Sequence, residues 1–315
     1  MPFIETQHLN IHYETAGTGE NVLVLVHGNF ASWRWWQPVF DRLPANVQAY
    51  AVDLRGCGDT EHPTDGYTIE QLATDLHAFA TTLNLPPFHV VGHSLGGAVV
   101  MQFALDFPEY VKTVMLVAPA PDGGLSALQR HNGNLKQVST TTNSLDFLKT
   151  NYRLMQMLGV NRPLLVRPMR KVTPTLTDEE MFDVILNDAA RMAPEALTGF
   201  YKTLESWNIH SCIKHVDVPM LILAGAQDVL VPVSALEEMR DHLKRGRLEV
   251  WEDVGHSPQL EQPDRFMALI LSFMEELSAK VPVITTSQEF HNTWFGNLKH
   301  GLGRFLRGLG QRMAS

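Results

Sequence analysis

The sequence predicts an α/β protein with a mostly parallel, eight-stranded sheet that helices cover on both faces. Short apolar runs rich in Val, Leu and Ala alternate with segments of helical periodicity, an order typical of parallel strands joined by helices. Most of these runs are apolar throughout, as expected for strands buried on both faces. A length of 315 residues allows one large core with an insertion.

The elements follow in chain order. Residues 3–17 alternate like a strand pair and predict an antiparallel hairpin. Between Thr68 and Asn84 apolar residues recur every three or four positions, which predicts a helix with one buried face, and Thr68 with Gln71 offers a capping box. Another helix is expected directly after residue 94, with Pro108 ending it. The six remaining strands are expected at residues 22–28, 49–56, 89–94, 111–118, 219–226 and 247–253.

Residues 122–212 have a different character. They are rich in Asn, Thr, Met and Leu, contain helical patterns and lack a convincing strand run. Because the segment is too long for a loop in a compact domain, we expect a helical cap or lid there, and a core made of residues 1–121 and 213–280. Its methionines suit an apolar ligand but are equally ordinary core residues: Met155, Met157, Met169, Met181 and Met192.

The charge is unevenly distributed. The net charge is −9, yet residues 281–315 carry four basic residues against Glu289 and sum to +3, which leaves −12 for the first 280 residues. The acidic body argues against nucleic-acid binding. Within the tail, residues 291–312 have amphipathic spacing, which favours docking on the protein itself, self-association or a membrane surface. The oligomeric state does not follow from the sequence.

We expect no cofactor and no metal. Two cysteines, Cys57 and Cys212, are too few for a disulfide framework or a four-cysteine zinc site, and the 14 histidines are scattered without an HExxH or CxxC pattern. The N-terminus lacks the pattern of a signal peptide, and no run approaches the roughly 20 apolar residues of a membrane span. A cytoplasmic protein is therefore expected, with peripheral membrane association through the tail as an option.

One motif carries most of the functional information. Gly92-His93-Ser94-Leu95-Gly96 matches G-x-S-x-G between a predicted strand and a predicted helix, which is the context of a nucleophile elbow. The turn at Ser94 is so tight that side chains two residues away on either side would clash. Serine is a poor nucleophile at its free pKa, so it needs a base that a third group orients.

The chain supplies such a base and such an orienting group in a suitable order. Asp228 follows the predicted strand at 219–226, and His256 follows the last predicted strand. The order Ser, Asp, His, each on a loop after a strand, predicts a triad in which His256 moves the Ser94 proton and Asp228 holds the imidazole. Asp122, after the strand at 111–118, is the alternative acid.

Four blocks together resemble the α/β-hydrolase family over roughly residues 3–279: HGNFAS at 27–32, DLRGCGDT at 53–60, GHSLGG at 92–97, and GAQD with VGHSPQLEQPD near the end. The resemblance implies an oxyanion hole formed at Asn29, with Phe30 adjacent, and at Leu95. It implies structural roles for the residues His27, Gly28, Asp53, Arg55, Gly56 and Gly58.

Differences between this chain and the motifs of known subfamilies narrow the range of reactions that we expect it to catalyse. Haloalkane dehalogenases and epoxide hydrolases of this family use an Asp nucleophile, whereas this chain has Ser94. A serine implies an acyl-enzyme, and we expect a carboxylesterase or lactonase acting on an apolar small molecule. A C–C bond hydrolase of the meta-cleavage type, and a hydrolase-fold receptor or regulatory binding protein, remain open alternatives. Of Trp33, Trp35 and Trp36, we expect one or two in the core and one at the substrate cleft.

Overall fold

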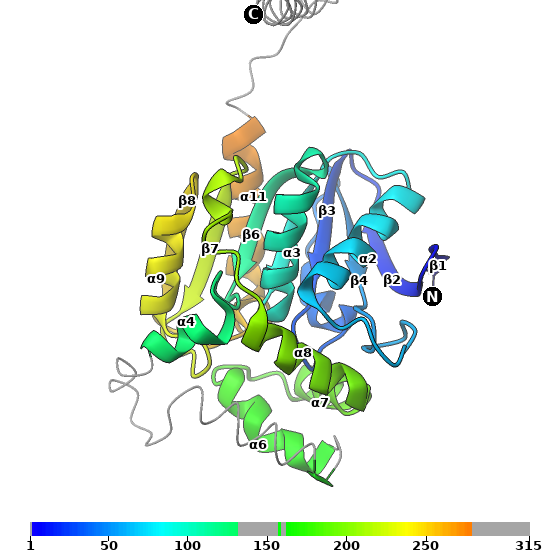
Figure 1. Ribbon diagram of the computed structural model, residues 1–315, viewed down its shortest axis with the longest axis vertical. Coiled ribbons are helices and arrows are strands. Elements are labelled where there is room, and N and C mark those ends of the chain that lie inside the picture. The colour runs from blue at the N-terminus through cyan, green and yellow to red at the C-terminus, as the bar shows by residue number, and fades with distance from the viewer. Residues whose placement is uncertain (1, 132–156, 159–161, 279–315) are drawn as a thin grey trace, which may run out of the picture. The chain divides into compact units, whose positions relative to one another are not determined.

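Eight strands form one sheet in the order β1-β2-β4-β3-β5-β6-β7-β8 (Figure 1). Their bounds are β1 (Phe3–Glu5), β2 (Asn10–Gly17), β3 (Asn21–Val26), β4 (Val47–Val52), β5 (Phe88–His93), β6 (Val111–Val117), β7 (Met220–Gly225) and β8 (Gly246–Trp251). The pairs β1–β2 and β2–β4 are antiparallel, and every pairing from β4 to β8 is parallel. The predicted fold class is confirmed.

This architecture comes from a computed structural model, which describes residues 2–131, 157–158 and 162–278. Residues 1–271 form one compact unit, to which the description below refers. The predictions for the tail, residues 281–315, lie outside the described residues. Among the described helices, none combines the length and apolar character needed to cross a membrane.

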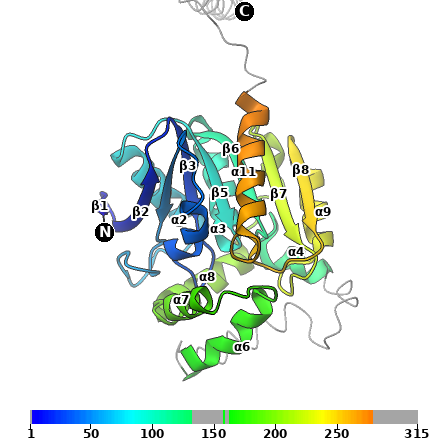
Figure 2. The same ribbon diagram turned by 180° about the vertical axis from the view of Figure 1, so that it is seen from behind.

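Helices cover both faces of the sheet. Figure 1 shows α2, α3 and α9 in front of the strands, and Figure 2 shows α11 on the opposite face. The helices outside residues 122–212 are η1 (Trp33–Trp36), α1 (Gln37–Phe40), α2 (Ile69–Thr82), α3 (Leu95–Asp106), η2 (Pro108–Tyr110), η4 (Ile213–His215), α9 (Val233–His242), α10 (Pro258–Glu261) and α11 (Pro263–Ser278). Every residue of the strands β5 and β7 is buried, which explains why β7 is apolar throughout and why β5 departs from an apolar run only at His89 and His93.

Two local predictions need correction. The Thr68 hydroxyl accepts a hydrogen bond from the backbone N–H of Gln71, as expected. The Gln71 side chain, however, donates to Asp75 at 3.0 Å, so the second hydrogen bond of a capping box, from Gln71 back to Thr68, is not formed. The strands predicted to reach residues 28 and 56 end at Val26 and Val52. The next side chains, His27 and Asp53, accept hydrogen bonds from loop N–H groups and so belong to the loops.

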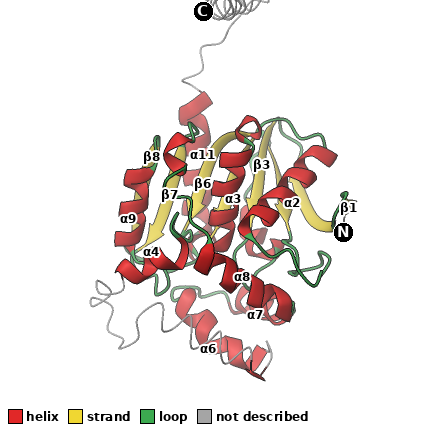
Figure 3. Ribbon diagram, viewed as in Figure 1, coloured by secondary structure: helices red, strands yellow, loops and turns green. Residues whose placement is uncertain are grey.

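The described part of residues 122–212 is helical. It contains α4 (Gly124–His131), α6 (Arg162–Val172), α7 (Glu179–Ala190) and α8 (Pro194–Ser206), and its described residues include no strand. Figure 3 shows α6, α7 and α8 beyond the ends to which the strand arrows point. We call residues 122–212 the cap segment; that it forms a separate lid domain stays a prediction.

Candidate functional site

Ser94 lies at the sharp turn between β5 and α3. Its φ of +53° is a left-handed conformation that is costly for a residue with a side chain. Its N–H donates to the carbonyl of Val117 at 2.9 Å, and its own carbonyl accepts the N–H groups of Gly97 and Ala120 at 2.9 and 3.0 Å. Three backbone bonds therefore hold Ser94 in this strained conformation.

The flanking glycines allow the close approach that the motif predicts. A Cβ at Gly92 would lie 2.3 Å from the carbonyl oxygen of Gly96, and one at Gly96 would lie 2.4 Å from that of Val26. A Cβ at Gly28 would lie 2.9 Å from the Ser94 Cβ, so the loop after β3 passes directly beside the serine. Larger side chains at these three positions would force backbone apart.

Asp228 and His256 form a buried pair on the loops after β7 and β8. The Nδ1 atom of His256 lies 2.7 Å from Oδ2 of Asp228, and each side chain is at most 4% exposed. The other oxygen, Oδ1, accepts the N–H groups of Leu230 at 2.7 Å and Val231 at 3.2 Å. Because the carboxylate accepts a hydrogen bond from Nδ1–H, the proton of the neutral imidazole stays on Nδ1 and Nε2 of His256 is left as the basic nitrogen.

His93, beside the serine, contacts the same histidine loop. Its Nε2 donates to the carbonyl of His256 at 2.9 Å, and its ring stacks on Trp35 with centroids 5.5 Å apart. Burial, and then the nearby His256, lower the pKa of His93 well below its usual value. His93 is therefore neutral near pH 7 and adds no positive charge beside the basic nitrogen.

Two backbone N–H groups at this end of the sheet are available as donors. Among the described residues, no group accepts a hydrogen bond from the N–H of Asn29 or of Leu95. The Asn29 side chain accepts the N–H of Phe30 at 3.0 Å, and Phe30 has a φ of +59°. Phe30 is thus removed as a donor, which leaves Asn29 and Leu95 as the pair that the sequence suggested.

A cavity of about 140 Å³ connects these groups. Asn29, Ser94, Leu95 and His256 all line it. Of the three neighbouring tryptophans, Trp35 lines it, while Trp36 stacks on Phe266 in the core. Apolar side chains make up most of the remaining wall: Ala120, Leu125, Leu128, Met169, Val172, Leu197, Leu204, Leu230 and Val231.

Comparison with known proteins identifies the family of this chain. The sequence model described as "Alpha/beta hydrolase family" matches residues 23–269. The chain belongs to the alpha/beta hydrolase family. Within that family it is 27% identical over 267 residues to a pimeloyl-[acyl-carrier protein] methyl ester esterase of Vibrio vulnificus, covering 84% of this chain and 98% of the relative.

Other members of the family are similarly distant. Human epoxide hydrolase 4 is 26% identical over 299 residues, which cover 88% of this chain and 79% of the relative. The solved structure of an esterase from Exiguobacterium antarcticum superposes with a TM-score of 0.75 at 20% identity, covering 87% of this chain and 98% of the other. The fold is therefore shared at low sequence identity.

Asp122, the alternative acid, lies elsewhere in this alpha/beta hydrolase. Its Oδ2 atom is 2.8 Å from Nδ1 of His242 and 3.3 Å from Nδ1 of His210. The structure thus places Asp228, and not Asp122, against His256. Neither histidine partner of Asp122 was singled out from the sequence.

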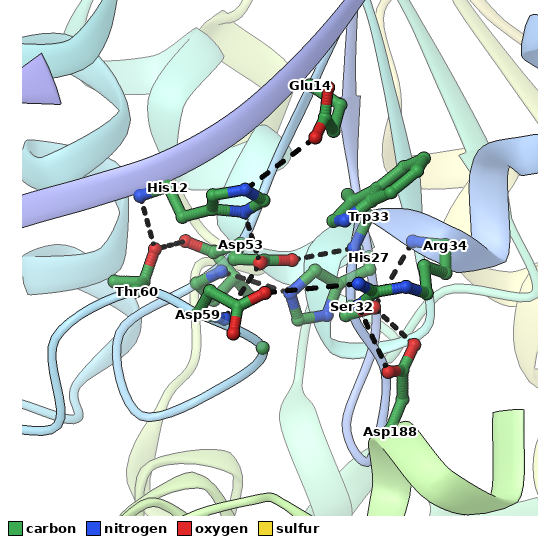
Figure 4. A network of polar contacts seen from close by, with 12 residues as sticks. His12, Glu14, His27, Ser32, Trp33, Arg34, Asp53, Asp59, Thr60 and Asp188 are labelled. Carbon is green, nitrogen blue, oxygen red and sulfur yellow. Dashed lines mark hydrogen bonds and ion pairs between the residues drawn. The ribbon is translucent and has the colours of Figure 1, made fainter. Parts of the chain in front are cut away.

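Asp53, one of the residues expected to be structural, joins the loops beside the site (Figure 4). Asp53 is buried and accepts hydrogen bonds from the N–H groups of Trp33 and Asp59 at 2.7 and 3.0 Å, while His12 lies 2.7 Å away. Asp188, on α7 of the cap segment, bonds the Ser32 hydroxyl and Arg34. This network connects the cap segment to the loop that begins at His27.

Sequence reasoning missed most of the cavity wall. Of the five methionines considered, Met169 lines the cavity, Met157 is 80% exposed, Met192 is buried in the core and Met181 is partly buried against it, while Met155 lies outside the described residues. It also missed Glu261, which accepts the N–H groups of Gly255 and Ser257 on either side of His256 at about 3.0 Å. No local pattern marks such residues, because their roles depend on contacts between distant segments.

Proposed function

We propose that this alpha/beta hydrolase cleaves a carboxylic ester or lactone of an apolar small molecule through an acyl-enzyme formed on Ser94. One observation carries the proposal: a serine held at a strained strand-to-helix turn lines the same apolar cavity as His256, which is paired with the buried Asp228. The esterase among its relatives supports the same class of reaction.

The residues have distinct roles in this reaction. Nε2 of His256 takes the proton of the Ser94 hydroxyl as Oγ attacks the carbonyl carbon. The N–H groups of Asn29 and Leu95 stabilise the oxyanion, an interaction that strengthens only as charge develops. The protonated His256 then gives its proton to the leaving oxygen, the C–O bond breaks, and the acyl group remains on Ser94.

The second half of the reaction repeats these steps with water. His256 takes a proton from water, the resulting hydroxide attacks the acyl carbon, and the proton returns to Ser94 Oγ as the acid leaves. Asp228 stabilises the imidazolium in both halves. The similarity to epoxide hydrolase 4 does not favour epoxide opening. An alkyl-enzyme requires a carboxylate as the nucleophile, and this chain has a serine at position 94.

The cavity wall supports an apolar substrate. A dry apolar cavity near 150 Å³ accommodates a molecule such as benzene. A cavity of about 140 Å³ therefore fits a short or medium acyl chain in this conformation. We propose that neutral short-chain esters are turned over faster than esters with a charged acyl group.

The test is a substrate panel of p-nitrophenyl esters, neutral lactones and a charged ester, assayed with the full chain. We expect multiple turnovers, and at least about a 10⁴-fold loss in Ser94→Ala. Ser126→Ala is the matched control, because Ser126 is exposed on α4 and its hydroxyl, among the described residues, bonds only the carbonyl of Gly123.

A fluorophosphonate probe followed by peptide mass analysis gives a second readout. It should label Ser94 in the unaltered chain and nothing in the Ser94→Ala variant. Full activity in that variant would refute the mechanism. A single slow turnover across the panel would instead favour a receptor function.

A further inference from the structure

Two histidines converge on one buried carboxylate at the base of the cap segment. We propose that Asp122, His210 and His242 form a binding site for a divalent cation of the zinc type. The scattered histidines of the sequence predicted no metal site, so this proposal revises that expectation and goes beyond the proposed hydrolase function.

The distances suit a small tetrahedral ion. Zinc lies about 2.0–2.1 Å from imidazole nitrogen and about 2.0–2.2 Å from carboxylate oxygen, so its tetrahedral ligand atoms are roughly 3.4 Å apart. Nδ1 of His210 is 3.3 Å from Oδ2 of Asp122, and Nδ1 of His242 is 2.8 Å from the same oxygen. The three ligand atoms lie within 4.8 Å of one another. Small side-chain rotations would complete the site.

The ligand set selects the kind of cation. Two imidazoles with one carboxylate suit zinc and its transition-metal neighbours, whereas magnesium and calcium prefer oxygen ligands. Binding would replace the Nδ1 protons that otherwise bond the carboxylate. The side chains of Asp122, His242 and His210 are 3%, 20% and 50% exposed. The ion therefore has a route from solvent, and water can complete its coordination.

The other cluster of candidate ligands, His12 with Asp53 and Asp59, is less suitable. Both oxygens of Asp53 already accept backbone N–H bonds, from Trp33 and Asp59. An ion there would have to break contacts that hold two loops. In the part of the chain that the structure describes, Oδ2 of Asp122 bonds the two histidines and accepts no backbone N–H group.

The place of the site suggests what a bound ion does. Asp122 begins the cap segment, His210 lies near its end, and His242 is the last residue of α9. The Asp122 carbonyl also accepts the N–H of Ile209 at 2.8 Å. An ion would therefore tie both ends of the cap segment to α9, near Leu125 and without touching Ser94. Its role is to restrain the cavity wall, and it takes no part in the reaction.

The experiment uses the full chain without an affinity tag, after treatment with a chelator. Calorimetric titration with zinc chloride should give one site per chain, and zinc should raise the melting temperature where magnesium does not. His210→Gln and His242→Gln should each weaken zinc binding at least about tenfold. His215→Gln and Cys212→Ser are matched controls that keep binding, since both residues are exposed and close in sequence to His210.

Melting curves without zinc check that each variant folds. Cobalt substitution in the unaltered chain tests the site independently, because tetrahedral coordination gives intense visible absorption bands that zinc abolishes. Absence of zinc binding in the unaltered chain overturns the proposal. So does undiminished binding in both histidine variants, or loss of binding in either control.

Discussion

At the scale of single residues, Asp228 determines which nitrogen of His256 is basic. One oxygen receives the Nδ1 bond and the other receives the N–H groups of Leu230 and Val231. The carboxylate cannot rotate without breaking these bonds. The imidazole is therefore held with Nε2 free for proton transfer.

Replacing that carboxylate tests the assignment of the acid. Asp228→Asn should lower kcat by about 10⁴-fold, because an amide NH₂ next to Nδ1 favours the wrong tautomer. Steady-state kinetics with a p-nitrophenyl ester measure the loss. Asp253→Asn is the control, since the exposed Asp253 side chain bonds Gln262 and Arg265 and, within the described ranges, no other residue. Asp122→Asn should cost far less than Asp228→Asn, and equal losses would contradict the assignment.

At the scale of elements, the turn between β5 and α3 depends on glycine. Gly96→Ala should lower the free energy of unfolding by about 1–3 kcal/mol, because its Cβ would meet backbone oxygen of β3 at 2.4 Å. Gly123→Ala is a milder control, with its nearest contact a side-chain atom at 3.2 Å. Urea unfolding measures the free energy of unfolding of both variants. Equal stability of the two variants would show that the turn relaxes easily.

The loop that carries His256 depends on a single carboxylate. Glu261 accepts the N–H groups of Gly255 and Ser257 and the hydroxyl of Thr175 in the cap segment, the last at 2.6 Å. Each of these partners is a donor. An amide NH₂ in place of one oxygen would therefore face another N–H or O–H group.

Glu261→Gln should consequently misplace the loop and lower kcat by about 10–100-fold, with a small change in KM. Steady-state kinetics separate the two constants. Glu252→Gln, an exposed residue close by, should leave both unchanged. A change in KM alone would indicate that Glu261 acts on the cavity wall instead of the histidine loop.

At the scale of the whole molecule, buried histidines make stability depend on pH. Burial lowers the pKa of His27 and His93, and burial with nearby Lys112 lowers that of His89 to about 4. Between the lowered pKa of each folded histidine and about 6.5, the ordinary pKa of histidine, the unfolded chain binds protons that the folded chain excludes. Stability should therefore rise with pH across this window. Burial raises the pKa of Asp188. Above the ordinary pKa of an aspartate, this shift makes the stability of the fold decrease as pH rises, which opposes the effect of the histidines.

His89→Gln tests this balance away from the candidate site. Glutamine can still bond the Thr113 hydroxyl, which lies 2.9 Å from Nδ1 of His89. The variant should reduce the slope of unfolding free energy against pH by up to about 1.4 kcal/mol per pH unit between about pH 4 and 6.5. Urea unfolding across this range gives the slope. An unchanged slope would show that His89 titrates normally in the folded chain.

Local patterns predicted much of this molecule. Apolar runs placed β3 to β8 and alternation placed the β1–β2 hairpin, because a strand buried on two faces favours apolar residues and a strand with one exposed face admits polar ones in alternation. The glycines around Ser94 marked the turn, because backbone crowding acts between neighbours in sequence. Some strands were predicted to extend too far, as after Val26, where the His27 side chain accepts a hydrogen bond from a loop N–H group.

The sequence by itself determined the succession of strands along the chain, the turn at Ser94, and two carboxylates after strands as candidate partners of His256. Only the tertiary structure decided between them, by placing Asp228 at 2.7 Å from His256 and Asp122 between His210 and His242. The tertiary structure also determined which residues line the cavity and where Glu261 lies. The reason is physical: hydrogen bonding and burial depend on distances in space, and these partners lie 28, 88 and 120 residues apart.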